Sequence, residues 1–389
     1  MTVLIDPPNA PGHGRLWSHL ASDESYAELH AFAARVGIPA RGFDRDHYDV
    51  PADLHDRMLA EGALPVSSRE LINRLVDAGL RRRKSSALGA RWPGQRLRRP
   101  ALLRPGDLVA VVAPAGPTDR ARVAAGVEVL TSWGLRVRHS DAAGGESLPW
   151  LAGPDEERAT RWQDAWLDRE VKAIWASRGG FGSQRLLDHV DWSALARTRP
   201  TWLVGFSDVT ALHQAVAARL GVLTAHGPGV AALAEADPRT TESVRALVME
   251  GRSEPLQGRP GVGGVAEGVL VGGNLATLAS TVGTADSLPA AGGIALLEDV
   301  AEAPYRLDRL LTQVVRSGWL DDARAIAAGD FTDCGDLDLV RRLLLERLGG
   351  LGVPLVLDLP VGHGRVNLTV PLGARARLDG SAGTLTPLL

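Results

Sequence analysis

The segment 201–212 constrains the fold of this chain more than any other part of its sequence. Residues 201–205 form an apolar run typical of a buried strand, and residues 208–212 have the pattern of a helix that is beginning. An abrupt Gly-Phe-Ser turn joins the two. A serine on such a strand-to-helix turn projects its hydroxyl into the space above a sheet. The segment therefore predicts an α/β sheet with Ser207 at the carboxyl end of one strand.

Two interpretations of Ser207 are open from this segment alone. Serine is a preferred N-cap and Asp208 suits a first helical turn, so Ser207 could serve to begin the helix. Alternatively Ser207 is a nucleophile, and the peptide N–H of Asp208 is one donor to an oxyanion. A nucleophilic hydroxyl also needs a base and a group that orients this base.

Two downstream residues suit those roles. Glu298 ends an apolar, strand-like stretch, and His363 lies between two glycines after another such stretch. A carboxylate at the end of a buried strand is costly without a partner, and an imidazolium that forms during catalysis is a suitable one. We predict Ser207 as nucleophile, His363 as base and Glu298 as the orienting group. The alternatives are a solvent-exposed histidine and an ion pair of the glutamate with Arg306 or Arg309.

Several motifs then follow one another in the order found in a known family. They cover the chain from about residue 103 to its C-terminus, so they are far more specific than one Gly-x-Ser turn. The chain resembles the LD-carboxypeptidases, which are the muramoyltetrapeptide carboxypeptidases and their microcin-immunity relatives. The motifs are Arg178-Gly179-Gly180-Phe181-Gly182, Gly205-Phe206-Ser207-Asp208, His226-Gly227-Pro228, Gly272-Gly273-Asn274-Leu275, Leu297-Glu298-Asp299, Tyr305-Arg306-Leu307-Asp308-Arg309 and Pro360-Val361-Gly362-His363-Gly364.

This resemblance implies a serine L,D-carboxypeptidase with the triad Ser207, Glu298 and His363, and with Gly180 and Asp208 as oxyanion donors. It implies removal of the terminal D-alanine of a murein tetrapeptide, at the bond to the L-centre of diaminopimelate, in cell-wall recycling. It also implies a homodimer and no metal or organic cofactor. The implied fold is a parallel-sheet domain like flavodoxin or the glutamine amidotransferases, followed by a smaller β-rich α/β domain.

Three residues are candidates for substrate binding. Arg178 is a candidate for the terminal carboxylate of D-Ala, and Glu302 for the free ammonium of diaminopimelate. A surface ion pair of Glu302 with Arg306 is an equally good interpretation. Asn274 resembles a family position near the site. The glycine-rich loop at Arg178 lacks the endings of a P-loop and of a dinucleotide fingerprint, so we expect it to supply an oxyanion N–H rather than to bind a nucleotide.

Three rival functions share parts of this pattern. A microcin-immunity-type peptidase would act on peptidyl or aminoacyl nucleotides with the same fold. A muropeptide-binding sensor would keep recognition without turnover. An α/β-hydrolase esterase has the same order of triad residues, but Val209 stands where its elbow needs glycine.

The order of elements predicts several domains. Alternating strand and helix patterns from residue 107 onward indicate a parallel sheet, and short glycine-punctuated strands follow from about residue 258. The triad would then lie between two catalytic domains, a common place for small-molecule sites. We predict a small N-terminal α/β domain at 1–80, a basic linker at 81–100, a domain with the nucleophile at 101–255, and a domain with Glu298 and His363 at 256–389.

Composition excludes other classes. The net charge of −3 gives no general attraction to nucleic acid or anionic membranes, and the linker lacks the interleaved aromatic residues of a nucleic-acid binder. A single cysteine, Cys334, rules out an internal disulfide. The N-terminus lacks a basic region followed by an apolar core, and no window approaches about 18 apolar residues. We expect a cytoplasmic protein whose partner is a small muropeptide, with no role for nucleic acid or membrane.

The first 80 residues lie outside the peptidase resemblance and look similar to a small bacterial domain of unknown function. Ser67 or Ser68 predicts the start of a helix that carries Leu71. Five residues there could in principle ligate a metal, but they form no tight pair at metal-ligand spacing, so we predict no metal site. These residues are Asp6, His19, His30, His47 and Asp49.

Overall fold

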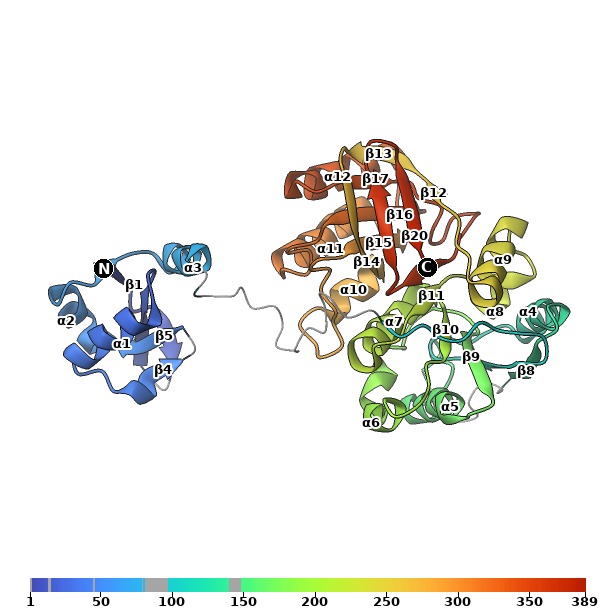
Figure 1. Cartoon of the computed structure of the whole chain (residues 1–389), viewed down its shortest axis with the longest axis horizontal. Helices are drawn as coiled ribbons and strands as arrows, with labels where there is room; N and C mark the ends of the chain where they lie inside the picture. Colours follow the sequence, from blue (N-terminus) through green and yellow to red (C-terminus); the bar gives the residue numbers. More distant parts are fainter. Residues whose placement is uncertain (1, 13–14, 45, 79, 81–96, 140–147) are drawn as a thin grey trace. The chain divides into compact units, whose positions relative to one another are not determined.

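A computed structural model of the chain describes residues 2–12, 15–44, 46–78, 80, 97–139 and 148–389. The chain forms two compact units, Met1–Ser85 and Ser86–Leu389. Figure 1 draws the first unit in blue and the second in colours from teal to red. Most of the linker predicted at 81–100 falls outside the described residues.

The first unit is a mixed sheet with helices on both faces. Its strand order is β4-β5-β3-β1-β6, and β2 pairs with β3. Leu29 and Phe32 of α1 pack on one face, whereas Leu71 and Leu75 of α3 pack on the other. The elements are β1 (Val3–Ile5), β2 (Ala10–Gly12), β3 (Arg15–Ser22), α1 (Tyr26–Arg35), β4 (Phe43–Asp44), β5 (His47–Pro51), α2 (His55–Ala60), β6 (Leu64–Pro65) and α3 (Ser68–Asp77).

Both long helices of this unit begin at serine caps. Ser25 Oγ accepts a hydrogen bond from the N–H of Glu28 at 3.2 Å, and Ser67 Oγ accepts one from the N–H of Glu70 at 3.1 Å. Each cap satisfies one of the N–H groups that a helix N-terminus leaves unpaired. The cap at Ser67 confirms the helix start predicted before Leu71.

The first sheet of the second unit has the order β18-β11-β10-β9-β7-β8. All neighbours in it are parallel except β18, which is antiparallel to β11. The strand predicted within 201–205 is confirmed as β10. The elements are β7 (Leu108–Val112), α4 (Arg120–Ser132), β8 (Arg136–His139), α5 (Asp155–Leu167), β9 (Val171–Ala176), α6 (Trp192–Leu195), β10 (Trp202–Gly205), α7 (Thr210–Ala215), β11 (Thr224–His226), α8 (Val230–Leu233) and α9 (Pro238–Arg245).

Helices cover both faces of this sheet (Figure 1). Trp162 of α5 and Leu212 of α7 belong to the apolar cluster on one face. Leu130 of α4 and Val230 of α8 belong to the cluster on the other face. A parallel sheet buried on both faces needs strands that are apolar throughout, which explains the continuous apolar runs in the sequence.

The second sheet has the order β12-β20-β19-β14-β15-β16-β17-β13. Leu278, Leu311 and Leu344 of three helices cover one face. The other face encloses a cluster that joins Leu256 near one end of the sheet to Val356 near the other, so the sheet curls around its own side chains. The elements are β12 (Leu256–Gln257), β13 (Arg259–Val262), β14 (Val265–Asn274), α10 (Leu275–Thr281), β15 (Ile294–Val300), α11 (Pro304–Arg316), β16 (Ala325–Thr332), α12 (Leu337–Leu348), β17 (Leu355–Leu357), β18 (Val370–Leu372), β19 (Arg375–Asp379) and β20 (Thr384–Leu388).

Strand β18 connects the two halves of the second unit. It lies late in the sequence, yet it pairs with β11 of the first sheet, with Leu372 opposite Thr224. The chain that carries His363 therefore returns to the sheet that carries Ser207 within a few residues.

3₁₀ turns follow both β9 and β10, and the turn after β10 leads directly into α7, so the helix predicted there is present. The helix predicted from Asp208 begins with a 3₁₀ turn at Ser207–Val209, because the positive φ of Ser207 is incompatible with an α-helix. The segment after the glycine-rich loop forms a 3₁₀ turn at Arg185–His189. This turn follows Gly182, which has a φ of 117°. Short connections between elements often form 3₁₀ turns.

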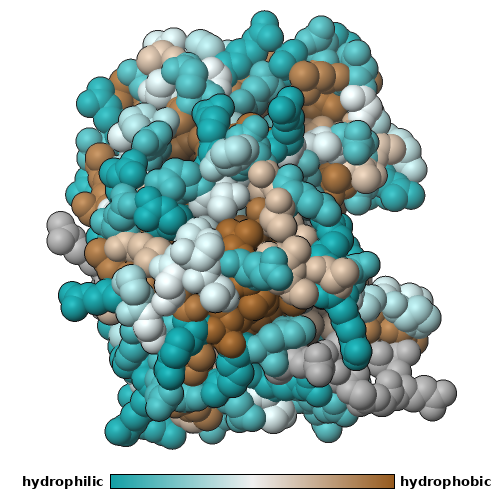
Figure 2. Space-filling model, turned by 90° about the vertical axis from the view of Figure 1, so that its right-hand side faces the viewer, coloured by the Kyte–Doolittle hydropathy of each residue, from teal (hydrophilic) through white to brown (hydrophobic). Residues whose placement is uncertain are grey.

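The surface carries mostly hydrophilic side chains on the face drawn in Figure 2, with a group of hydrophobic ones near its middle. Apolar atoms make up more than half of the surface of ordinary folded proteins, so this group alone indicates no partner. Within the described residues, no helix is both long and apolar enough to cross a bilayer.

The packing of α4 on α8 predicts the effect of one substitution. A Cβ at Gly126 would lie 1.9 Å from the carbonyl oxygen of Val230, so the helices would have to separate. We expect Gly126→Ala to lower the free energy of unfolding by about 1 to 3 kcal/mol. A Cβ at Gly350 would meet nothing within 4 Å, so Gly350→Ala should change the free energy of unfolding by less than about 0.5 kcal/mol. Denaturant unfolding measures both, and equal losses would contradict the packing.

Candidate active site

Ser207 lies on a strained turn at the carboxyl end of β10. Its φ of 64° is in the left-handed region, which costs a non-glycine residue about 1 kcal/mol or more. Two glycines make room for the turn. A Cβ on Gly179 would lie 2.8 Å from Ser207 Cβ, and one on Gly205 would lie 2.9 Å from a methyl group of Val209. The backbone thus holds the serine in the conformation of a nucleophile elbow.

The glycine-rich loop 178–182 is tied to this turn by Asp208. The N–H of Ser183 donates to Asp208 Oδ2 at 2.7 Å, and the hydroxyl of Ser183 donates to the carbonyl oxygen of Asp208. The carboxylate of Asp208 is therefore occupied in fixing the loop. The role predicted for its peptide N–H, as a donor to an oxyanion, stays a prediction.

Gly180 has a backbone orientation suited to a hydrogen-bond donor. The carbonyl oxygen of Gly179 accepts a hydrogen bond from the N–H of Gly116 at 3.2 Å. Because a trans peptide places its C=O and N–H on opposite sides, the N–H of Gly180 points away from Gly116. Gly179 packs closely against Ser207, since a Cβ on Gly179 would lie 2.8 Å from Ser207 Cβ. The N–H of the next residue, Gly180, is therefore close to the elbow.

His363 is held by Glu298. The two side chains are 2.7 Å apart, from His363 Nδ1 to Glu298 Oε2. Glu298 is fully buried, whereas 16% of the His363 side chain is exposed. An ionised carboxylate can only accept, so Nδ1 carries the proton and Nε2 is the basic atom of the neutral ring. This is the arrangement in which a carboxylate orients a catalytic base.

The local backbone creates space for Glu298. The pairing of β15 with β16 shifts its register on either side of this residue, which marks a β-bulge. A Cβ on Gly362 would lie 2.7 Å from Glu298 Oε2, and one on Gly329 would lie 3.2 Å from Glu298 Cβ. Both positions therefore favour glycine if the carboxylate is to occupy this place.

A second histidine, His226, faces the other carboxylate oxygen. Its Nε2 lies 3.8 Å from Glu298 Oε1, and both side chains are fully buried. Neither ring nitrogen has a hydrogen-bond partner among the described residues. We predicted no function for this side chain from the sequence. Its motif follows a parallel strand next to β10, and that position is the signal that could have identified it.

Two opposing effects set the pKa of Glu298. Burial would raise this pKa, but the hydrogen bond with His363 and the nearby imidazole of His226 outweigh burial and hold the pKa below its ordinary value. The carboxylate is therefore ionised at neutral pH. In that state it can stabilise the imidazolium of His363.

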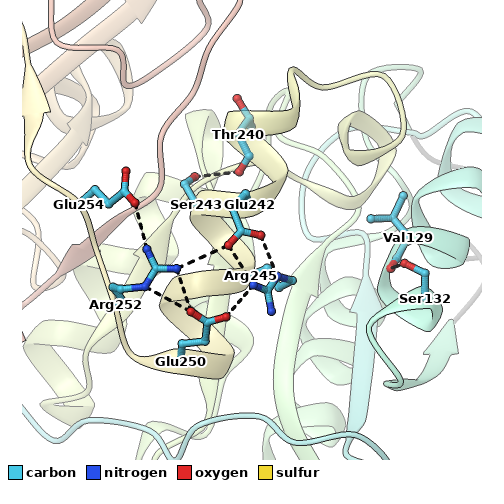
Figure 3. Close-up of polar contacts among 9 residues, drawn as sticks. All are labelled: Val129, Ser132, Thr240, Glu242, Ser243, Arg245, Glu250, Arg252 and Glu254. Atoms are coloured by element: carbon cyan, nitrogen blue, oxygen red, sulfur yellow. Dashed lines mark hydrogen bonds and ion pairs between the residues drawn. The ribbon is translucent and has the colours of Figure 1, made fainter.

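The loop that carries His363 is anchored to α9. The residue before the histidine donates its N–H to Asn367 Oδ1 at 3.0 Å. The N–H of Asn367 donates to Thr240 Oγ1 at 2.9 Å, and the N–H of Thr369 donates to Ser243 Oγ at 2.9 Å. Figure 3 shows Thr240 and Ser243 together on this helix. Three hydrogen bonds thus fix the loop on both sides of its turn.

Ion pairs surround the end of the same helix (Figure 3). Arg245 donates to Glu242 at 2.8 Å and to Glu250 at 2.6 Å. Arg252 donates to Glu250 at 2.9 Å and to Glu254 at 3.0 Å. These side chains are partly exposed, so solvent screens each pair and its contribution to stability is small.

The imidazole of His363 lies beside the turn of the predicted nucleophile. Its ring centroid is 4.7 Å from that of Phe206, the residue before Ser207. In the described part of the chain, the hydrogen bond of His363 goes to Glu298 rather than to Ser207. Bonds between nucleophile and base often tighten only when substrate binds. The structure thus brings the three predicted triad residues to one place.

Asn274 lies at this place but its side chain is occupied. It pairs with Glu298 across β14 and β15 and is buried. Its Oδ1 caps α10 by accepting from the N–H of Thr277 at 3.0 Å, and its Nδ2 donates to Asp299 Oδ1 at 3.0 Å. These contacts fix the backbone beside the site rather than point the amide at a substrate.

The other two predicted binding residues differ in their surroundings. Arg178 is exposed on the glycine-rich loop and donates to the carbonyl oxygen of Pro117 at 3.4 Å. Glu302 lies 3.8 Å from Arg306, the ion pair that the sequence left open. Neither alternative partner predicted for Glu298, Arg306 or Arg309, pairs with it, and both arginines lie over the ring of Tyr305.

A groove of about 1140 Å³ lies at the opposite, amino-terminal end of the second sheet. Its lining includes Gly268, Gly293 and Arg324, and none of the predicted site residues. Its lining includes no serine, threonine, cysteine or histidine, and its Glu267 is paired with Arg375 at 2.9 Å, so its size does not identify it as the active site. The candidate active site is the cluster around Ser207.

Comparison with known proteins identifies both units. Models of the LD-carboxypeptidase N-terminal and C-terminal domains match residues 109–227 and 267–378. The model of a protein family of unknown function, DUF4031, matches residues 3–78. A Streptomyces coelicolor protein is 45% identical over 301 residues, which are 74% of this chain and 95% of that protein.

Solved structures share the fold of the second unit. The crystal structure of muramoyltetrapeptide carboxypeptidase from Oxalobacter formigenes is 30% identical with a TM-score of 0.65, and the match covers 72% of this chain and 97% of that one. The structure of MccF in complex with glutamyl sulfamoyl guanosine is 23% identical with a TM-score of 0.68, and the match covers 76% and 99%. The fold and the family matches together define the second unit as one of a family of peptidases. The chain belongs to the LD-carboxypeptidase family.

His213, which lies behind the site, gives the fold a predictable pH dependence. Its Nε2–H donates to the carbonyl oxygen of Gly205 at 2.9 Å. Complete burial, reinforced by nearby His226, lowers the pKa of His213 from 6.5 to about 3. Between these values the unfolded chain binds a proton that the folded chain does not. This histidine therefore lowers stability as pH falls below about 6.5, by up to about 1.4 kcal/mol per pH unit.

The substitution His213→Gln, which keeps a donor for Gly205, tests this prediction. Between pH 7.5 and 5.0, the free energy of unfolding of the wild type should fall relative to the variant by about 2 kcal/mol. Urea unfolding of both proteins at both pH values measures it. Burial raises the pKa of Asp299 and the pKa of Asp330 to about 6, which has the opposite effect on stability. Both proteins contain these two residues, so the comparison cancels their effect. An unchanged difference would contradict a neutral buried histidine.

Proposed function

We propose that this chain is a serine L,D-carboxypeptidase that removes the terminal D-alanine of murein tetrapeptides. The observation that carries the proposal is the buried Glu298 bonded to His363 beside the strained turn of Ser207. Membership of the LD-carboxypeptidase family supports the reaction, and similarity to the Oxalobacter formigenes enzyme supports the substrate class.

In the acylation step, Ser207 Oγ attacks the carbonyl carbon of the bond between diaminopimelate and D-Ala while His363 Nε2 takes the hydroxyl proton. The peptide N–H groups of Gly180 and Asp208 stabilise the oxyanion. Glu298 stabilises the imidazolium and takes no proton itself. His363 then protonates the departing amine, so D-Ala leaves and the peptide stays as an ester on Ser207.

In the second step, His363 takes a proton from water as the water oxygen attacks the ester carbon. The bond to Ser207 Oγ breaks, and the proton returns to this oxygen. The products are the tripeptide carboxylate and the free enzyme. These steps need no group beyond the protein and water.

The exposed charges suggest how substrate is held. The guanidinium of Arg178 is our proposed partner for the carboxylate of D-Ala, since it is exposed on the loop next to the elbow. Glu302, which is half-buried near the start of α11, is our proposed partner for the diaminopimelate ammonium. Asn274 would act indirectly, by fixing the strand end beside Glu298.

We further propose that the enzyme works in the cytoplasm, on recycled wall fragments, and as a homodimer. The family resemblance supports all three parts of this proposal. The net charge of −3 supports a small peptide rather than nucleic acid as the ligand.

The proposal predicts that the purified full-length protein releases one alanine from a diaminopimelate-containing tetrapeptide, detected by mass spectrometry. Ser207→Ala should lower kcat/KM by about 10⁴ or more, and Glu298→Gln by roughly 10³ to 10⁴ because the imidazole loses its orienting charge. Ser193→Ala is the matched control, because this hydroxyl is exposed and bonds to Asp191 at 2.6 Å. It should leave kcat/KM unchanged.

Three outcomes would contradict the proposal. Cleavage of a peptidyl nucleotide without cleavage of the tetrapeptide would favour the microcin-immunity-type activity. Binding of the tetrapeptide without alanine release would favour a sensor. Equal activity in wild type and Ser207→Ala would exclude this serine as the nucleophile.

A further inference from the structure

The first unit gathers two histidines and a carboxylate on one face of its sheet. Strands β3 and β5 are antiparallel, and their register places His19 directly opposite Asp49. His47 lies two residues from Asp49 on the same strand, so it shares this face. Tyr48, between them, points to the other face and into the apolar core. The topology alone thus brings three possible metal ligands together.

The distances match those of a metal-ligand set. One donor atom from each of His19, His47 and Asp49 lies within 4.8 Å of the others. His47 Nε2 is 3.3 Å from Asp49 Oδ1, and the two imidazole rings are 5.0 Å apart at their centroids. Donors that lie about 2.1 Å from one transition-metal ion are about 3 to 4 Å apart, and the distance between His47 Nε2 and Asp49 Oδ1 already has this value.

Each imidazole is also backed by a carboxylate. His19 Nδ1 is 2.9 Å from Asp6 Oδ2, and Asp6 is buried with 1% of its surface exposed. The N–H of His19 donates to the other oxygen of Asp6 at 2.6 Å. His47 Nδ1 is 2.7 Å from Asp46 Oδ1. Carboxylates that bond to Nδ1 direct Nε2 toward a ligand, as in metal-binding histidines.

We propose that His19 and His47, through Nε2, and Asp49, through its carboxylate, bind one divalent transition-metal ion of the zinc class. Two imidazoles and a carboxylate are borderline nitrogen and oxygen donors, which favour such ions over calcium or magnesium. Asp6, Asp46 and Asp49 together supply negative charge that offsets the charge of the ion.

The number of ligands assigns the metal a role beyond holding the fold. Structural zinc sites close with four protein ligands, whereas sites with three leave a position for water or substrate. Asp49 is partly exposed, so solvent reaches this position. The metal would therefore be able to bind an oxygen ligand from solution.

The proposed site differs from the expectation of no metal site in the first 80 residues. Among the five candidates, the structure brings together His19, His47 and Asp49, and Asp6 supports one of them. His30 lies elsewhere, bonded to the hydroxyl of Tyr48 at 2.8 Å. The sequence shows no close pair of ligands because the register of two strands, not spacing along the chain, creates the set.

Zinc binding by the full-length protein tests the proposal. The chelator-treated protein is dialysed against Zn²⁺ at pH 7.5, and bound metal is counted by mass spectrometry; Co²⁺ absorption reports the ligand geometry. The wild type should bind one Zn²⁺ that Asp49→Ala and His47→Ala do not bind. Asp6→Asn should weaken binding by about 10- to 100-fold. His30→Gln, on the opposite face, is the matched control and should bind like the wild type.

The outcomes separate a metal site from a hydrogen-bonded histidine pair. Loss of one Zn²⁺ and of the Co²⁺ spectrum in Asp49→Ala and His47→Ala, with unchanged circular dichroism, would support the site. Asp49→Ala is the safer variant, because its side chain is 47% exposed and its loss leaves the core intact. Equal metal binding in wild type and both variants, or no binding in the wild type, would overturn the proposal.

Discussion

The bond between the buried carboxylate of Glu298 and His363 is the interaction on which the candidate site depends. An ionised carboxylate out of contact with water costs several kcal/mol unless partners compensate it. His363 bonds to one carboxylate oxygen of Glu298, and His226 lies near the other. Gly329 and Gly362 leave room for this side chain because they have no Cβ. These glycines and histidines accommodate the charge of Glu298, and the position of Glu298 in turn orients the imidazole of His363.

The site also depends on how the two sheets of the second unit meet. The elbow belongs to the first sheet and the carboxylate to the second. The histidine belongs to a loop that α9 bonds at Asn367 and Thr369 and that Asn367 closes by a bond to the residue before the histidine. Strand β18 then returns from that loop to the first sheet. A shift of one sheet relative to the other would therefore separate base and nucleophile, so packing far from Ser207 bears on catalysis.

Local patterns allowed much of this to be predicted from the sequence. The strand at 202–205 and the turn at Ser207 follow from an apolar run and a glycine, and the order of motifs indicates the family. Contacts between distant segments could not be predicted in this way. The pairing of β18 with β11, the place of His226 near Glu298, and the register that sets His19 opposite Asp49 all depend on which strands become neighbours.

The central claim is that an imidazole oriented by Glu298 activates Ser207. Labelling with a serine-directed fluorophosphonate, followed by peptide mass spectrometry, tests it most directly, because the reagent needs an activated hydroxyl and no knowledge of the substrate. We expect a single adduct on Ser207 in the wild type and strongly reduced labelling in His363→Ala. Absence of the adduct from Ser207, or equal labelling of both proteins, would contradict it.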